Sequence, residues 1–317
     1  MRIGYPCINR SIGCTSSRTF RLASYSERRL VETVEQNLDC LERVLHWNVE
    51  HGIGFFRISS DLVPFASHPV CAYDWARRFR DRFRALGRLV RRHRMRISMH
   101  PDQFVLLNAL DDKIVESSIR ELDYHARVLD LTQLPTSAKL QIHVGGVYGD
   151  KQAGINRFAE RYSRLPQSIR RRLVVENDDR SYTVADCLEV NQLTGVPVLF
   201  DVFHHRVNPS FGGVRASLRA CVATWRRSDG LPIVDYSSQE PGQRRGRHAE
   251  HVDLGNFRRF LAQARGIECD VMLEIKDKEK SALEAISTLN RVTGVERVQC
   301  DRVPCTGPHV PMESPMV

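Results

Sequence analysis

The chain has 317 residues, of which 42% are hydrophobic and 27% are charged. This composition is ordinary for a globular protein and excludes a disordered chain, and no apolar run approaches the length of a membrane span. The formal net charge is +9. A basic surface attracts polyanions, which makes nucleic acid a candidate partner, although arginines scattered over solvated helix faces would give the same total.

The elements in chain order predict repeated βα units, because short apolar or β-branched runs alternate with longer stretches of helical spacing. Ser26 is a suitable N-cap for the first helix, which carries an apolar stripe of Leu30, Val34, Leu38, Leu41 and Leu45. Eight runs are predicted to be strands: 2–5, 54–58, 96–99, 139–144, 173–176, 196–200, 233–236 and 271–275.

This pattern predicts an α/β fold, a single-domain (β/α)₈ TIM barrel that occupies residues 1–293. Residues 237–251 are polar and rich in Gly and Arg, so we expect a long functional loop between the last two strands. Residues 294–317 lose the pattern and end in a Pro-rich segment, which predicts a flexible C-terminal tail.

The cysteines bear on the compartment. Nine are present, they form no Cys-x-x-Cys pair, and one is left over. This argues against a disulfide framework and against a thiolate zinc site. The N-terminus also has no long apolar segment of the kind that signal peptides carry. We therefore expect a reduced, cytoplasmic protein without a membrane segment.

Ionisable side chains gather where the predicted strands end, which is the active-site face of a TIM barrel. A lone histidine at such a place is usually a satisfied loop or core residue, but coincidence across six consecutive strands is improbable. Of the adjacent pair His204 and His205, we expect His204 to face a metal and His205 to lie behind it. His251 is left out because it could lie on the surface. The expected metal ligands are His100, His143, Glu176, Asp201, His204, Asp235, His248 and Glu274.

Imidazole and carboxylate donors without thiolates suit Mn²⁺, Zn²⁺, Fe²⁺ or Mg²⁺, and so many donors imply more than one ion. Such a site hydrolyses phosphodiesters by activating water and by neutralising charge on the phosphate. Arg244, Arg245 and Arg247 would add phosphate contacts from the neighbouring loop. The expected catalytic residues are Glu176, Asp201, Glu274 and Lys276.

With these residues in place, the chain resembles the UV damage endonuclease family over residues 1–290. The segments that carry the resemblance are IGYPCIN (3–9), FFRISSDLVPFASH (55–68), MHPDQF (99–104), VVENDD (174–179), DVFHH (201–205), YSSQEPG (236–242) and MLEIKDKE (272–279). Each segment alone is weak, and together they are highly specific.

The resemblance implies a TIM barrel that incises double-stranded DNA on the 5′ side of ultraviolet photoproducts, and at some abasic sites. It implies divalent ions, most often manganese, more than one and as many as three. The resemblance implies the same metal ligands that the strand ends predict, and this chain departs from the family pattern at one position. Family members often place Lys-x-His at the end of the seventh strand, with a carbamylated lysine in at least one, whereas this chain has Ile233 and Asp235. Asp235 would supply an oxygen ligand at that position.

The resemblance also implies contacts with the lesion. Gln103 and Phe104 would probe the duplex and fill the gap left by flipped bases, and Tyr5 and Asn9 would contact the lesion or its flanking phosphate. A core role is almost equally open for Tyr5. We expect a monomer that needs no protein partner.

Three alternatives stay open at this point. One is a sugar isomerase or epimerase on the same barrel, since fold does not fix function. Another is a DNA-binding protein whose metal cluster no longer catalyses, which the altered segment at Ile233 and Asp235 would fit. The third is an endonuclease for abasic sites alone.

Overall fold

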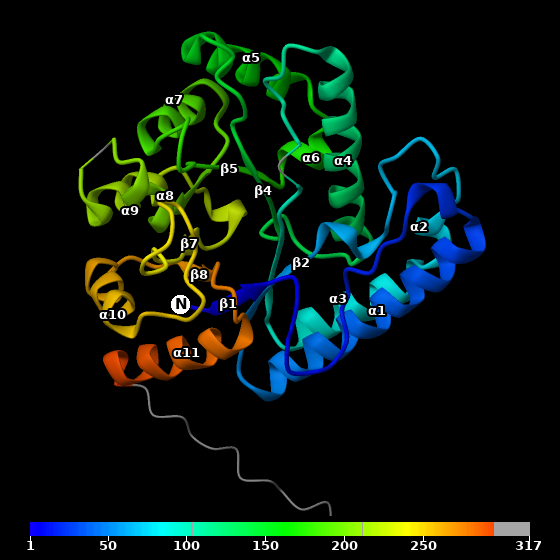
Figure 1. Ribbon diagram of the computed structural model, residues 1–317, viewed down its shortest axis with the longest axis horizontal. Coiled ribbons are helices and arrows are strands. Elements are labelled where there is room, and N and C mark those ends of the chain that lie inside the picture. The colour runs from blue at the N-terminus through cyan, green and yellow to red at the C-terminus, as the bar shows by residue number, and fades with distance from the viewer. Residues whose placement is uncertain (103, 211, 295–317) are drawn as a thin grey trace, which may run out of the picture.

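The computed structural model describes residues 1–102, 104–210 and 212–294. Within them, parallel strands pair in chain order, and the last strand pairs with the first to close a barrel (Figure 1). The TIM barrel predicted from the sequence is therefore confirmed, with strand ends that differ from the prediction by at most two residues. The strands are β1 (Ile3–Pro6), β2 (Phe55–Ile58), β3 (Arg96–Met99), β4 (Lys139–His143), β5 (Leu173–Glu176), β6 (Val198–Asp201), β7 (Ile233–Tyr236) and β8 (Asp270–Leu273).

Helices surround the barrel, and most of the apolar core lies between them and the outer faces of the strands (Figure 1). The α-helices are α1 (Glu27–Glu50), α2 (Trp75–Arg78), α3 (Arg80–Arg92), α4 (Asp112–Leu131), α5 (Lys151–Arg164), α6 (Gln167–Arg170), α7 (Val184–Thr194), α8 (Val202–Val207), α9 (Val214–Val222), α10 (Leu254–Gln263) and α11 (Glu279–Thr293). Short 3-10 turns lie at Leu22–Ser24, Ser60–Leu62 and Arg227–Asp229.

Helix α1 forms as its sequence predicts. The Ser26 side chain accepts a hydrogen bond from the backbone N–H of Arg29 at 3.2 Å, which caps the first turn. The predicted stripe from Leu30 to Leu45 is buried against the barrel. Burial of this stripe fixes the helix, and with it the loop that leads from β1 to α1.

The barrel interior is layered, because every second residue of a strand points inward. A buried apolar layer fills the middle and consists of Phe55, Val174, Leu199, Ile233 and Met272. The backbone of Phe55 crosses β1 so closely that a Cβ on Gly4 would lie 2.2 Å from its carbonyl oxygen, which explains the glycine. Two residues further along the same strands stand Arg57, Glu176, Asp201, Asp235 and Glu274. The inward side chains therefore form a charged layer at the carboxyl ends of the strands, directly above the buried apolar layer.

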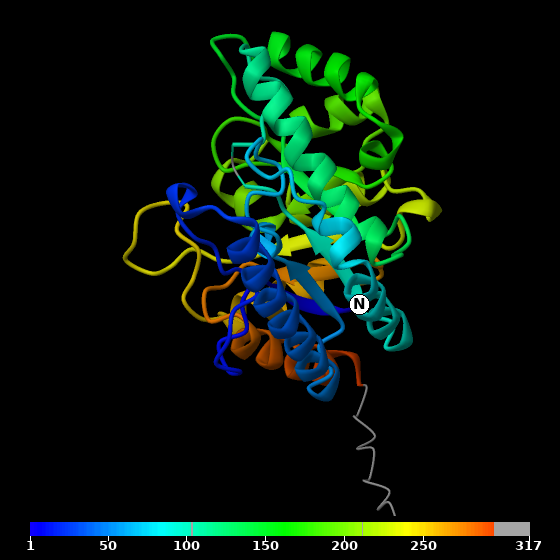
Figure 2. The same ribbon diagram turned by 90° about the vertical axis from the view of Figure 1, so that its right-hand side faces the viewer.

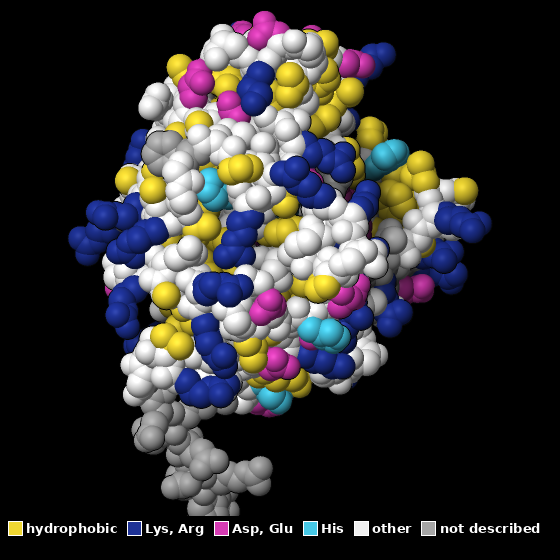
Figure 3. Space-filling model, turned by 60° about the vertical axis from the view of Figure 1, so that its left-hand side comes forward, with side chains coloured by type: hydrophobic (Ala, Val, Ile, Leu, Met, Phe, Trp, Pro, Cys, Tyr) yellow, Lys and Arg dark blue, Asp and Glu magenta, His cyan; other side chains and the backbone are white. Residues whose placement is uncertain are grey.

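The loop between β7 and α10 is long, as predicted, and it folds back on itself through a bridge between Gln239 and His248. Figure 2 shows this yellow loop projecting from the same side of the barrel as the blue loop that follows β1. The carboxyl ends of the strands open between such loops. On the face in Figure 3, Lys and Arg side chains are spread over the surface with acidic side chains between them.

The cysteine spacing argues against a disulfide framework, and one pair of cysteines is nevertheless bonded. Cys14 and Cys40 are bonded, with Cα atoms 5.9 Å apart, and they join the β1–α1 loop to α1. Spacing could not reveal this pair, because the loop brings Cys14 back onto the helix only after folding. Among the described helices, none is long and apolar enough to cross a membrane. The predicted tail, from 295 onward, lies outside the described residues.

Candidate metal centre

All eight expected metal ligands lie at the carboxyl end of the barrel. Their donor atoms form three overlapping groups in which the atoms lie within 4.8 Å of one another: His100, His143 and Glu176; Glu176, Asp201 and His204; and Asp201, Asp235 and Glu274. His248 comes from the β7–α10 loop, and its Nδ1 lies 3.9 Å from Glu274 Oε2. The strand-end prediction therefore identified residues that are clustered in space.

Glu176 is the point where three imidazoles converge. His100 Nε2 lies 3.5 Å and His143 Nε2 3.9 Å from Glu176 Oε2, and His204 Nδ1 lies 3.2 Å from Oε1. Burial alone would raise the pKa of Glu176, but the histidines hold it well below its usual range. Glu176 is therefore an ionised carboxylate in a buried place, and it is shared by two of the donor groups.

Asp201 has two separate tasks. Its Oδ1 accepts the backbone N–H of His204 at 2.6 Å and caps α8, which turns the His204 ring toward the cluster. Its Oδ2 is buried and has no hydrogen-bond partner among the described residues. Burial raises the pKa of Asp201 to about 7, against the pull of His204. The Oδ2 atom lies 3.5 Å from His204 Nδ1. A buried carboxylate oxygen without a hydrogen bond is costly, and a cation beside it would remove that cost.

Two of the histidines, His100 and His248, are oriented as metal ligands commonly are. Nδ1 of His100 lies 2.8 Å from the Pro101 carbonyl, and Nδ1 of His248 lies 2.9 Å from the Glu274 carbonyl. If each Nδ1–H donates there, Nε2 presents its lone pair to the cluster. Together with the oxygen donors, these nitrogens form a set that fits borderline divalent ions such as Mn²⁺ or Zn²⁺.

Arg57 of β2 is part of the centre, and reading the strand ends missed it. Its Nη1 donates to Glu274 at 2.5 Å, and its Nη2 donates to Asp235 at 2.7 Å and to Gln141 at 2.7 Å. Gln141 in turn donates to Glu176 and Asp235. Burial would raise the pKa of Glu274, but Arg57 helps to hold it at about 2. The signal that could have found Arg57 is its place two residues after Phe55, on the inward face of β2.

Asp235 is thus both a member of a donor group and the partner of Arg57. One of its oxygens accepts from Arg57 and Gln141 together, and both accept from Arg57. The side chain has no exposed surface. This engagement explains how the charge of Asp235 is compensated, and it leaves fewer of its lone pairs for an ion than the other carboxylates offer.

The two neighbouring histidines differ as expected. His205 is buried beside Phe200, with ring centroids 5.4 Å apart, and its Nε2 lies 3.3 Å from the Ser217 hydroxyl. It therefore faces the helix layer behind the strands. His251 is exposed and pairs with Asp277 at 3.0 Å, at the surface.

The residues expected to contact DNA are placed unequally. Phe104 is 58% exposed, whereas Gln103 lies outside the described residues. Tyr5 has no exposed surface and donates to Asn48 at 2.7 Å, and Asn9 is buried and donates to the Tyr5 hydroxyl at 2.8 Å. Tyr5 therefore takes the core role that the sequence left open, and Asn9 supports it. This hydrogen-bonded burial is the reason why neither side chain presents a free group at the mouth.

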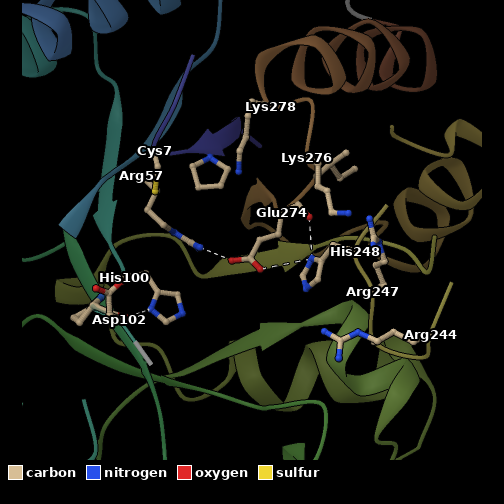
Figure 4. A pocket seen from close by; sticks show the side chains of 14 residues that line it. Cys7, Arg57, His100, Asp102, Arg244, Arg247, His248, Glu274, Lys276 and Lys278 are labelled. Atoms are coloured by element: carbon tan, nitrogen blue, oxygen red, sulfur yellow. Dashed lines mark hydrogen bonds and ion pairs between the residues drawn. The ribbon is translucent and has the colours of Figure 1, made fainter. Parts of the chain in front are cut away.

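The mouth holds two neighbouring cavities of about 680 and 560 Å³, which share His100, Arg244, Gly246, His248 and Glu274. The first is drawn in Figure 4, where Arg244 and Arg247 reach in from the β7–α10 loop. Arg245 instead donates to the carbonyl of Val207. Lys276, an expected catalytic residue, lines the first cavity and donates to Glu250 at 2.6 Å.

Comparison with known proteins gives three findings. The model of the UV-endonuclease UvdE family matches residues 1–305. A UV DNA damage endonuclease of Bacillus cereus (strain Q1) is 34% identical over 308 residues, which cover 94% of this chain and 97% of that protein. The crystal structure of SacUVDE superimposes with a TM-score of 0.89 at 42% identity, over 92% of this chain and 99% of that one.

More distant structures share the fold alone. Endonuclease IV from Thermus thermophilus superimposes with a TM-score of 0.52 at 17% identity, over 80% of this chain and 94% of that one. At this identity the likeness carries no argument about chemistry.

Proposed function

This chain belongs to the UV-endonuclease UvdE family, and we propose that it hydrolyses the phosphodiester on the 5′ side of ultraviolet photoproducts in double-stranded DNA, and at some abasic sites. The observation that carries this proposal is the cluster around Glu176, which lies at the bottom of a mouth bordered by Arg244 and Arg247. Family membership removes the sugar isomerase from the alternatives.

Divalent ions, in our proposal Mn²⁺ and more than one, would be held by His100, His143, Glu176, Asp201, His204, His248 and Glu274, with Asp235 as a further oxygen donor. When bound, such ions activate water and neutralise phosphate charge. Three ions would use all three donor groups. With two ions, the group that contains Asp235 would hold no ion, and Arg57 would balance the charge of Asp235. The buried carboxylates explain the need for cations, because Arg57 alone does not balance four acidic side chains.

The chain's own residues would bind and orient the duplex. Arg244 and Arg247 would contact phosphates without reading sequence. Phe104, which is exposed and follows His100 on the loop after β3, would enter the stack, and Gln103 would accompany it. A damaged dinucleotide is poorly stacked and paired, so its extrusion costs less than that of normal bases. Recognition would therefore read deformability.

We propose that the enzyme works as a monomer and inside the cell, where its DNA substrate is. Lys276 would act on the phosphate indirectly, because its ammonium group is hydrogen-bonded to Glu250. Glu176, Asp201 and Glu274 would do their work as ionised oxygen donors.

The test is incision of an end-labelled duplex with a single cyclobutane dimer, with Mn²⁺ or with a chelator, beside an undamaged duplex and an abasic one. We expect a metal-dependent cut directly 5′ to the dimer and none in the undamaged duplex. Cutting of the abasic duplex alone would identify an abasic-site endonuclease. Binding of the damaged duplex without any cut would identify a DNA-binding protein that has lost catalysis.

A further inference from the structure

The cations that line the first cavity differ in whether they are already paired. Arg57 is bonded to Glu274, Asp235 and Gln141, and Lys276 is bonded to Glu250. Arg247 also reaches Glu250, at 3.3 Å. Lys278 and Arg244 line the same cavity and, within residues 1–102, 104–210 and 212–294, form neither an ion pair nor a side-chain hydrogen bond; Arg244 belongs to the β7–α10 loop, whereas Lys278 follows β8.

Lys278 also has an unusual backbone. Its φ is 61° and its ψ is −115°, a conformation that costs free energy for any residue with a Cβ. The residue stands at the N-cap of α11, yet its side chain makes no capping hydrogen bond. A glycine would suit this backbone better, so the start of the helix does not explain the lysine.

The strained backbone directs the Lys278 side chain into the cavity. Figure 4 shows Lys278 entering the cavity from the segment after β8 and pointing toward Arg57 and Glu274. Pro6 and Cys7 form the wall beside it, and Cys7 likewise has a positive φ of 70°. Two residues with positive φ, from neighbouring segments, thus shape this part of the cavity wall.

We propose that Lys278 is a catalytic residue that binds a non-bridging oxygen of the scissile phosphate. This inference rests on the function proposed above. In the reaction a water oxygen forms a bond to phosphorus, the bond from phosphorus to the leaving sugar oxygen breaks, and that oxygen takes up a proton. Lys278 keeps its protons throughout. Its ammonium group offsets the charge of the phosphate in a half-buried place, where a charged hydrogen bond is strong.

The first experiment compares Lys278→Met with Lys280→Met, which removes the same charge from an exposed position on α11. We expect the incision rate at saturating DNA to fall by roughly 10- to 100-fold in Lys278→Met, as for loss of a charged hydrogen bond to substrate. Lys280→Met should stay within about two-fold of the parent, and Lys278→Arg should recover part of the rate. Equal rates for Lys278→Met and Lys280→Met would overturn the proposal.

The second experiment removes the charge from the DNA. Binding is measured in a Glu176→Gln background, so that the duplex stays whole, using a dimer-containing duplex with either a normal phosphate or a neutral methylphosphonate at the scissile position. With Lys278 present, the methylphosphonate should weaken binding by about 10-fold, and with Lys278→Met the two duplexes should bind within about two-fold of each other. The same weakening with both proteins would mean that Lys278 does not contact this phosphate.

A third variant separates contact from folding. Lys278→Gly relieves the backbone strain, so its Tm should equal or exceed that of the parent while incision falls as in Lys278→Met. A lower Tm would mean that the lysine supports the fold instead. The parent enzyme is assayed alongside: if it does not cut the damaged duplex, the proposed function fails, whereas if it cuts and the Lys278 variants cut equally well, only this inference fails.

Discussion

The three imidazoles around Glu176 lie at distances that a shared cation would bridge, so the charge of this residue should matter more than its shape. We predict that Glu176→Gln lowers the incision rate by roughly 100-fold or more, because a neutral amide oxygen binds a divalent ion far less well. Gel analysis of single-turnover incision measures the effect. The Tm should stay within a few degrees of the parent.

The matched control is Glu116→Gln, which makes the same change at an exposed position on α4. It should cut at the parental rate. Retained incision in Glu176→Gln would exclude this carboxylate from the metal centre.

Another residue controls stability at acid pH. His125 of α4 is fully buried, and its Nδ1 lies 2.7 Å from the Glu121 carbonyl, while Nε2 has no partner among the described residues. Burial lowers the pKa of His125 to about 4. The folded state therefore resists protonation that the unfolded state accepts near pH 6.5, so the contribution is complete above that pH and is lost as the pH falls toward 4.

We predict that this histidine alone removes about 2 kcal/mol of unfolding free energy between pH 7 and pH 5. Urea denaturation at the two pH values measures the difference. In His125→Asn, which does not titrate, the difference should shrink by that amount, although the variant is less stable overall. His93→Asn, an exposed control, should keep the parental difference; an unchanged difference in His125→Asn would refute the assignment.

At the scale of elements, the Cys14–Cys40 bond fastens the β1–α1 loop to α1. Asn37 of the same helix fastens it again, because it accepts the N–H of Arg18 at 2.8 Å and donates to its carbonyl at 3.0 Å. The bond closes a segment with a sequence separation of 26. Chain entropy gives a stabilisation of about 3 kcal/mol for a loop of this size.

We therefore predict that reduction with dithiothreitol lowers the free energy of unfolding by about 3 kcal/mol, as measured by guanidinium denaturation. A Cys14→Ser/Cys40→Ser variant should match the reduced parent and should not respond to dithiothreitol. If the oxidised and reduced parents unfold at the same denaturant concentration, the loop is held by its other contacts.

The elements also mark where sequence reasoning ends. Strands could be predicted because each is a short apolar run, and their ends could be predicted as the site because parallel strands in a barrel all end on one face. Arg57 was not found in that way, because only His and carboxylate side chains were sought at the strand ends. Its hydrogen bonds to Asp235 and Glu274 place it in the centre. The role of Tyr5 could not be decided from the sequence. The sequence places Tyr5 near the mouth of the barrel, but only its hydrogen bond to Asn48 shows that it belongs to the core.

For the whole molecule, the net charge of +9 predicts binding that depends steeply on salt. Removal of one side chain that binds a phosphate should reduce the slope of log K against log salt by about one. We predict this reduction for Arg244→Ala, measured by fluorescence anisotropy with a damaged duplex. Arg291→Ala, in the last turn of α11, should keep the parental slope. A salt-independent affinity in the parent would contradict a DNA-facing mouth.

The apolar layer of Phe55, Val174, Leu199, Ile233 and Met272 gives the charged layer an exit on one side only. Ions cannot pass through the barrel interior, so they must enter and leave by the opening that the duplex would cover. Bound DNA should then block the release of ions. Release to a chelator should slow severalfold when an uncleavable damaged duplex is present, as stopped-flow detection with a metal indicator would record. The enzyme would keep its ions for the whole time that it remains on the lesion.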